Sequence, residues 1–517
     1  MSHWLDDAVF YEIYPQSFQD TNSDGIGDFQ GIIQRLDYIR SLGCNAIWMN
    51  PCFVSPFHDA GYDVADYYTA APRYGTNDDL KRLFAAAHER GMHVILDLVP
   101  GHTSIEHPWF QQSALPTPNP YTDRYIWTDN VWEDFEGIGN IRGSLRGYSE
   151  RDGSCAVNFY TTQPALNFGF AHPDPAHPWQ QAADAPGPMA TRQAMKDVMR
   201  FWLSMGCDGF RVDMAASLIK NDPDASATIA LWQDFRAFLD KEFPDAVMVS
   251  EWGQPDQALT AGFHMDFLLH FGPSHYNDLF RCEHPFFSKE GGNVSQFAKK
   301  YQQLYDSTGG KGLICIPSGN HDMERLAWKL DQEEIKIAFA FLLSMPGAPF
   351  IYYGDEIGMR YLDVPSVEGG SNRTGARSPM QWDRSANAGF SCASPEKLYI
   401  PIDPSEDRPT VASQQSDPHS LYHEVKKLLE LRHNHSVLQS NAAFAFVYAA
   451  ENRYPLVYTR RDQTGTLLIA INPSSQAASC PIAFQLGEIL YENGGAALEK
   501  DGVLKVPARS ASYIWIK

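Results

Sequence analysis

Hydrophobic and polar positions follow one pattern in three stretches of the chain, at residues 39–51, 88–102 and 201–213. In each stretch an amphipathic helix leads through a short turn with glycine into an apolar strand that ends in polar residues. The helix that leads into the middle stretch begins with Thr76 and Asp79 at the spacing of a capping box and ends at Gly91. The pattern therefore predicts a repeated unit of helix and strand.

The predicted strands are continuous apolar runs, which is typical of parallel strands covered on both faces. Further strands of this kind are predicted at residues 9–15, 247–252, 314–321 and 349–353, with a weaker candidate at 267–271. Together with the three stretches above they make eight. Eight parallel strands that alternate with helices predict an α/β fold, a closed (β/α)8 TIM barrel, whose active site lies at the carboxyl ends of the strands.

Two regions depart from this repeat. Residues 103–165 are rich in Pro, Gly, Asn and aromatic residues and are too long for an ordinary loop, which predicts a subdomain inserted after the third strand. Residues 436–517 alternate short strand-like runs with turn residues, which predicts a C-terminal antiparallel β domain. Residues 1–102 and 166–435 would then form the barrel.

Composition narrows the class of protein. The chain has 517 residues, 44% of them hydrophobic, and a net charge of -22, which argues against nucleic acid or anionic membranes as partners. No uninterrupted apolar run reaches about 18 residues, and the N-terminus has no basic or apolar leader. We expect a soluble, cytoplasmic globular protein, a monomer or small homo-oligomer. Its eight cysteines contain no C-x-x-C pair and are expected to be reduced and mostly buried.

Charged residues end several of the predicted strands. Arg211 and Asp213 are two positions apart on one strand, so their side chains point the same way. The cation would keep the carboxylate of Asp213 ionised, as a nucleophile requires. A purely structural ion pair is the alternative interpretation.

Two more acidic residues follow other strands. Glu251 ends one strand beside Trp252, whose apolar face favours a protonated carboxyl and hence a general acid. Asp322 follows His321 at the end of another. Glycoside cleavage uses two such acids, and a separation of about 5 to 5.5 Å indicates retention of configuration. The sequence gives no separation.

As a set, residues 97–102, 209–213, 250–253 and 319–322 resemble the four conserved regions of the α-amylase family, glycoside hydrolase family 13. The resemblance is to the oligo-1,6-glucosidase and α-glucosidase branch and covers nearly the whole chain. It implies a retaining mechanism with Asp213 as nucleophile, Glu251 as general acid/base and Asp322 binding and distorting the sugar ring. The side chains implied to line the same subsite are those of His102, Arg211 and His321.

The segment Gly61-Tyr62-Asp63 resembles a further motif, whose Asp holds the terminal glucose, and Arg373 and Arg377 resemble its Arg partners. In the oligo-1,6-glucosidase branch such a pair, here Asp63 with Arg377, closes the pocket behind the non-reducing end. The resemblance thus implies exo action on a small disaccharide or oligosaccharide. Met214, directly after the nucleophile, leaves the linkage open.

The segment from Asp20 to Asp28 places oxygen ligands at alternate positions around glycines, which suits a hard divalent cation. A plain solvated turn is the alternative. A similar calcium or magnesium loop in oligo-1,6-glucosidase-like relatives implies a structural Ca²⁺ or Mg²⁺. Its ligands would be Asp20, Asn22, Asp24, Asp28 and the carbonyl of Ile26.

Four functions are consistent with these motifs to different degrees. The first is an exo-acting α-glucosidase that hydrolyses maltose-like, isomaltose-like or sucrose-like substrates. A transglycosylase or isomerase, such as a trehalose synthase-like enzyme, is the near alternative, because sugar can capture the glycosyl intermediate as water does. An endo-acting α-amylase is third. A catalytically inactive transporter subunit is disfavoured, because Asp213, Glu251 and Asp322 are all present and no membrane helix is found.

Overall fold

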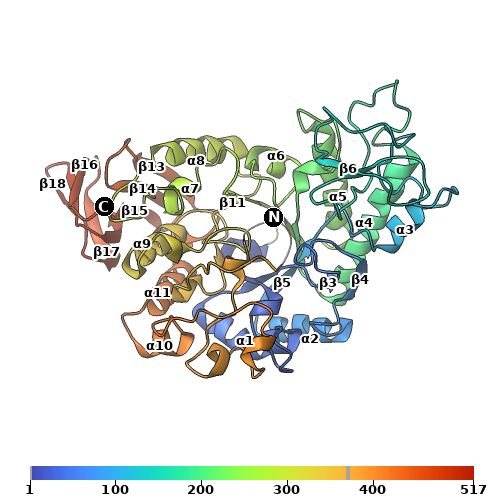
Figure 1. Cartoon of the computed structure of the whole chain (residues 1–517). Helices are drawn as coiled ribbons and strands as arrows, with labels where there is room; N and C mark the ends of the chain where they lie inside the picture. The colour runs from blue at the N-terminus through green and yellow to red at the C-terminus, as the bar shows by residue number, and fades with distance from the viewer. Residues whose placement is uncertain (1–2, 368–372) are drawn as a thin grey trace.

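A sheet of eight parallel strands forms the centre of the computed structural model, which describes residues 3–367 and 373–517 (Figure 1). The strand order is β11-β10-β9-β8-β5-β2-β1-β12. A parallel bridge between Pro317 and Phe350 joins the two outer strands and closes the barrel. The strands are β1 (Phe10–Ile13), β2 (Ala46–Met49), β5 (His93–Leu98), β8 (Gly209–Val212), β9 (Val247–Ser250), β10 (Met265–Phe267), β11 (Leu313–Cys315) and β12 (Phe350–Tyr352). The predicted TIM barrel is confirmed.

One predicted strand lies elsewhere in the chain. The weak candidate at residues 267–271 is replaced by β10, which ends at Phe267. The apolar run was misleading because Asp266, a buried acidic residue, stands in the middle of the true strand.

Helices surround the barrel, and their ends follow the expected rules. Thr76 and Asp79 form both hydrogen bonds of a capping box, and the helix ends at His88, with Gly91 at φ 66° in the turn that follows. Asp28 caps the first helix by accepting a hydrogen bond from Gly31 N. The main helices are α1 (Phe29–Leu42), α2 (Asn77–His88), α4 (Pro186–Met205), α5 (Ser226–Glu242), α6 (Pro255–Thr260), α8 (Ser295–Thr308), α9 (Gln332–Leu342) and α11 (Leu421–Asn434). Shorter helices are α7 (Asn277–Phe280) and α10 (Val411–Ser416).

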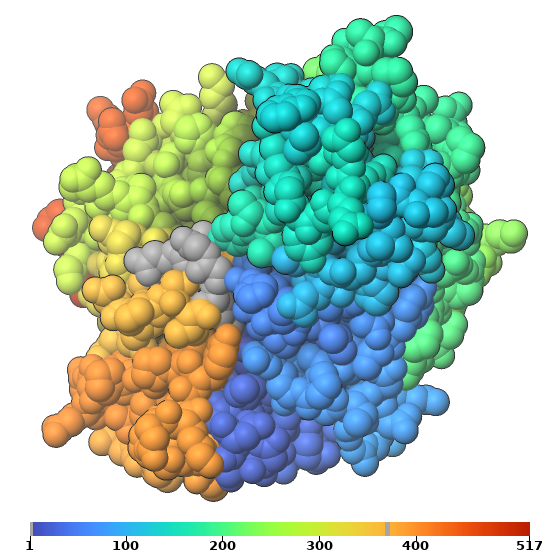
Figure 2. All heavy atoms as spheres, turned by 45° about the vertical axis from the view of Figure 1, so that its right-hand side comes forward, coloured from blue at the N-terminus to red at the C-terminus, as the bar shows by residue number. Residues whose placement is uncertain are grey.

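A long segment, here called the insert, separates β5 from α4 and carries α3 (Pro108–Ser113), β6 (Gly143–Leu145) and β7 (Cys155–Val157). A bridge between His102 and Ala165 joins the two ends of the predicted subdomain. The insert has a small apolar cluster of its own, which includes Phe135 and Trp179. In the space-filling view the cyan and green atoms of this segment lie above the blue N-terminal part of the barrel (Figure 2). The short strands β3 (Phe53–Val54) and β4 (Asp66–Ala70) pair nearby.

The C-terminal region forms two antiparallel sheets, as predicted, on the side of the barrel away from the insert (Figure 1). The helix that precedes this region, α11, is held to the segment after α9 by the fully buried Arg432, which donates hydrogen bonds to the carbonyls of Leu343 and Gly347 at 2.9 and 2.6 Å. One sheet has the order β13-β14-β15-β20-β17 and the other β16-β19-β18. Their strands are β13 (Ala443–Tyr448), β14 (Leu456–Asp462), β15 (Gly465–Asn472), β16 (Ala478–Pro481), β17 (Leu486–Asn493), β18 (Leu498–Lys500), β19 (Val503–Val506) and β20 (Ser510–Ile516).

Two expectations from composition can be compared with the structure. All eight cysteines are free and six of them are buried. Across residues 3–367 and 373–517, no helix has both the length and the apolar character that crossing a bilayer requires.

Candidate active site

A cavity of about 510 Å³ opens at the carboxyl ends of the barrel strands, between the barrel and the insert. Asp213, Glu251 and Asp322 all line it, and His102 lies on its wall. The sequence predicted the convergence of these residues because each directly follows, or lies just beyond, a strand of one parallel barrel.

Arg211 is the centre of the acidic cluster. Its Nη1 lies 2.9 Å from Oδ1 of Asp213 and 2.8 Å from Oδ1 of Asp97, and its Nη2 lies 3.0 Å from Oε2 of Glu251. The side chain is buried beneath the pocket floor. One guanidinium therefore fixes the nucleophile candidate and the acid/base candidate relative to each other.

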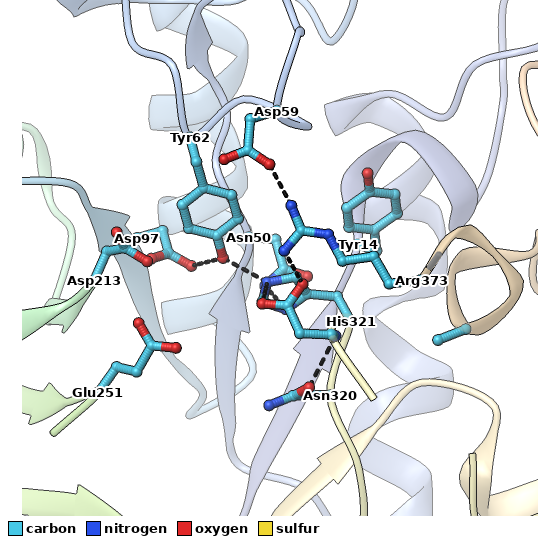
Figure 3. A network of polar contacts seen from close by, with 12 residues as sticks. Tyr14, Asn50, Asp59, Tyr62, Asp97, Asp213, Glu251, Asn320, His321 and Arg373 are labelled. Carbon is cyan, nitrogen blue, oxygen red and sulfur yellow. Dashed lines mark hydrogen bonds and ion pairs between the residues drawn. The ribbon is translucent and has the colours of Figure 1, made fainter. Parts of the chain in front are cut away.

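The carboxyl groups of Asp213 and Glu251 lie side by side (Figure 3). Burial and the adjacent Glu251 carboxylate raise the pKa of Asp213 well above its usual value, and Arg211 only partly opposes this. Arg211 lowers the pKa of Asp213, as expected, but burial and the charge of Glu251 act against it. Two adjacent carboxylates repel each other when both are charged, and a nucleophile and a general acid need one charged and one protonated partner.

Asp322 stands opposite this pair and is held by three cations. Its Oδ1 lies 2.7 Å from both Arg373 Nη1 and Arg377 Nη2, and its Oδ2 lies 3.2 Å from His321 Nε2. Burial opposes ionisation, but these positive charges outweigh it and hold the pKa of Asp322 well below its usual value. Asp322 is therefore a fixed anion, suited to accept hydrogen bonds from sugar hydroxyls.

His321 is buried beneath Asp322 and linked to a second acid. Its Nδ1 lies 2.8 Å from Oε1 of Glu12, and its Nε2 lies 2.7 Å from the hydroxyl of Tyr62. Burial lowers the pKa of His321, but Asp322 and Glu12 outweigh it and raise that pKa to about 9. The imidazolium thus forms part of the charge balance under the pocket.

This raised pKa predicts a pH-dependent stability. A histidine whose pKa is higher in the folded state stabilises the fold fully below about pH 6.5 and loses that effect as the pH rises through about 9. The rise of this pKa from its usual value to about 9 corresponds to about 3 kcal/mol. Because other buried groups also titrate in this range, the effect of His321 is read as a difference: the melting temperature of wild type should fall relative to that of His321→Gln between pH 7 and 9.5. His275→Gln, at an exposed histidine, should show the wild-type slope; equal slopes in all three proteins would contradict the prediction.

A buried lysine connects the insert to the barrel beside the pocket. Lys220 Nζ donates to the carbonyls of Ser217 and Asn140 at 2.6 and 2.9 Å and to Oδ1 of Asn158 at 3.1 Å. Burial lowers its pKa to about 7. Asn158 in turn contacts His102 Nδ1 at 3.1 Å, so this lysine orients two side chains of the pocket wall.

The predicted pair of Asp63 and Arg377 is wrong. The carboxylate of Asp63 accepts hydrogen bonds from Ser55 Oγ and from the amides of His58 and Asp59, within its own loop, at 2.9 to 3.1 Å. Arg377 contacts Asp322 and the carbonyl of His321 instead.

The pair that the structure forms is Asp59 with Arg373, and both line the pocket (Figure 3). Arg373 also binds Asp322, so one guanidinium joins two carboxylates at this end of the cavity. Asp59 also accepts a hydrogen bond of 2.7 Å from Gln163. Asp59 and Asp63 lie two residues before and two residues after Gly61 in the sequence. Side chains in a turn follow no regular alternation, so the sequence does not show which of the two faces the pocket.

The predicted metal loop precedes α1. Asp20 Oδ1 accepts hydrogen bonds from the amides of Asn22 and Ser23, and Asp24 Oδ1 accepts one from Ile26 N. Asp28 caps α1. Within the part of the chain that the structure describes, no group of three or more His, Cys, Asp or Glu residues is placed to hold a metal ion.

Paired carboxyls at the carboxyl ends of barrel strands, with a third acid held by three cations, are the arrangement of an enzyme that cleaves or transfers glycosyl groups. Residues 12–441 match the family model described as alpha amylase, catalytic domain. The chain belongs to the α-amylase family and is a glycoside hydrolase or transglycosylase.

Similar proteins include both kinds of enzyme. An oligo-1,6-glucosidase of Parageobacillus thermoglucosidasius is 31% identical, over 84% of this chain and 84% of its own length. A trehalose synthase/amylase of Mycobacterium tuberculosis is 33% identical, over 84% and 75%. The crystal structure of a trehalulose synthase from Pseudomonas mesoacidophila superposes with a TM-score of 0.82 at 26% identity, over 99% of both chains.

Proposed function

We propose that the protein is a retaining, exo-acting α-glucosidase that hydrolyses short α-glucosides. The observation that carries the proposal is a pocket lined both by the ion pair of Asp59 with Arg373 and by Asp213 and Glu251, which are bound to one guanidinium. We expect the ion pair to close the pocket behind a terminal glucosyl unit, so that an internal unit of a long chain does not fit.

The chemistry follows from the two carboxyls. Asp213 attacks the anomeric carbon while Glu251 gives its proton to the departing oxygen, and a glycosyl ester of Asp213 forms. Glu251, now ionised, takes a proton from the water that cleaves this ester, so both groups return to their starting state. Asp322 remains charged throughout and holds hydroxyls of the ring.

The alternative is transfer to a second sugar. The outer wall of the pocket carries apolar groups, among them Met214, Phe159 and Phe271, and Arg142 stacks over the ring of Phe159 at 4.6 Å. Such surfaces retain a sugar after bond cleavage and favour its recapture. Relatives named trehalose synthase and trehalulose synthase are the reason to test this outcome.

The test is a time course of products from maltose, isomaltose, sucrose, trehalose and soluble starch, with the anomers followed by NMR. Release of α-glucose from at least one disaccharide, with starch unchanged, is the expected result. New disaccharides without net glucose would make the enzyme an isomerase or transferase. Rapid shortening of starch would refute the closed pocket.

We also propose that the loop from Asp20 to Asp28 takes a structural Ca²⁺ or Mg²⁺. Support comes from its donor set, since Asp20, Asn22 and Asp24 present hard oxygens at alternate positions. The ion would stabilise the turn between β1 and α1 and has no part in the reaction.

Adding Ca²⁺ or Mg²⁺ after treatment with EDTA should therefore raise the melting temperature. At 100 times the dissociation constant the gain is about 2.7 kcal/mol. Asp24→Asn should remove the increment, while Asn substitution of Asp129, an exposed acid of the insert, should keep it. A wild-type melting temperature that neither ion changes would refute the site.

A further inference from the structure

Asp266 is a fully buried acid on β10, beside the strand that leads to Glu251. Its Oδ1 accepts hydrogen bonds from Ser250 Oγ at 2.7 Å, from Trp252 N at 3.2 Å and from Gly253 N at 3.4 Å. These donors belong to the residue before Glu251 and to the two residues after it. The carboxylate therefore holds the backbone on both sides of the acid/base candidate.

The surroundings of Asp266 give it no other use. Among residues 3–367 and 373–517 no basic side chain contacts Asp266 and its Oδ2 has no hydrogen-bond partner, while its strand neighbours Met265 and Phe267 are apolar core residues. Burial raises its pKa to about 7. A buried carboxyl without a cation costs stability, and an apolar residue would pack at this place more favourably. The cost indicates a role in the geometry of the adjoining loop.

Glu251 is fixed on its other side by the barrel. Its amide donates to Val212 O at 3.0 Å, and its Oε2 accepts from Met214 N at 2.9 Å. Those contacts fix the carboxyl group of Glu251 and the face of its backbone that is turned toward β8. The position of the backbone on the face toward β10 depends on Asp266, through its hydrogen bonds with Ser250 and Trp252.

We propose that Asp266 is a positioning residue that aims Glu251 at the oxygen of the leaving group. The inference rests on the proposed role of Glu251 as general acid. It predicts that loss of Asp266 impairs protonation of the leaving group more than it impairs substrate binding or attack by Asp213.

The test compares leaving groups. kcat/KM is measured for an α-glucoside with an alcohol leaving group, taken from the disaccharides that wild type cleaves, and for 2,4-dinitrophenyl α-glucoside, whose leaving group needs no proton. Asp266→Ala should lower kcat/KM about 30- to 100-fold on the disaccharide, a part of the usual contribution of a general acid, and less than about threefold on the dinitrophenyl substrate. Asp266→Asn keeps the acceptor oxygen and should remain near wild type on both.

Val247→Ala is the matched control, because Val247 is buried at the opposite end of β9. Val247→Ala destabilises β9, the strand that leads to Glu251, and should change kcat/KM on both substrates equally. Should Asp266→Ala not fold, Ser250→Ala removes the 2.7 Å contact and should show the same preference to a smaller degree.

Equal losses of kcat/KM on both substrates in Asp266→Ala, or in Ser250→Ala if that variant replaces it, would overturn the inference and leave Asp266 a purely structural residue. A failure of the proposed function is seen separately in wild type, which would then either cleave neither substrate or convert the disaccharide into new disaccharides without net glucose. Added azide provides a further readout, because it attacks the glycosyl ester without a general base. Azide should raise the kcat of Asp266→Ala on the dinitrophenyl substrate and leave that of Val247→Ala unchanged.

Discussion

Replacement of Asp213 by Asn is expected to lower kcat by roughly 10⁴-fold or more while the protein stays folded. The amide keeps the shape of the carboxyl and its contact with Arg211, but it cannot form the glycosyl ester on which the double displacement depends. The measurement is the initial rate on the best disaccharide of the substrate panel, together with the melting temperature.

Asp208→Asn supplies the control for this experiment. Asp208 precedes β8 at the opposite end of the strand from Asp213, where it binds His88 and His93. Its replacement should leave kcat within about threefold of wild type, since surface-side substitutions away from the site have small effects. A variant at Asp213 that retains the wild-type rate would refute the assignment of the nucleophile.

Arg373→Met is expected to lower kcat/KM on disaccharides about 100-fold or more. The guanidinium joins Asp59 to Asp322, and its loss leaves both carboxylates with fewer cations. The pKa of Asp322 should then rise, because Arg373 is one of the charges that hold it low. The acidic limb of the pH profile of kcat/KM should consequently move to higher pH.

Arg360→Met is the matched control, since Arg360 also pairs with an aspartate, Asp407 at 2.9 Å, but outside the pocket. Exposed ion pairs contribute little, so its kcat/KM and pH profile should match those of wild type. If Arg373→Met kept the wild-type rate on maltose and isomaltose, the closed end of the pocket would not be what binds the terminal glucose.

The barrel could be predicted from sequence because its strands are buried on both faces and read as apolar runs. β10 was the exception, since Asp266 interrupts its run and shifts the apparent strand toward Phe271. Strand ends also placed Asp213, Glu251 and Asp322 together, because the carboxyl ends of parallel strands meet at one face of the barrel.

Loop residues of the site were not predictable in the same way. Asp59 and Asp63 lie on either side of a turn in which Ala60 and Gly61 both have positive φ, at 54° and 100°. Because of this turn the carboxylate of Asp59 lines the pocket, whereas that of Asp63 accepts hydrogen bonds from amides of its own loop. The spacing of the two residues in the sequence does not reveal this difference. The effect of Glu251 on the pKa of Asp213 is hidden from sequence reasoning for a related reason, since Glu251 comes near it only through the fold.

The bond network of Lys220 has a consequence for protein engineering. Its side-chain nitrogen donates hydrogen bonds to oxygens of both the barrel loop and the insert, so neither part alone supplies all three acceptors. A chimera that receives its insert from a relative must carry matching carbonyl and amide oxygens along with it. Without them the buried amino group of Lys220 loses hydrogen-bond acceptors, and the exchanged segment is no longer held against the pocket wall at Asn158 and His102.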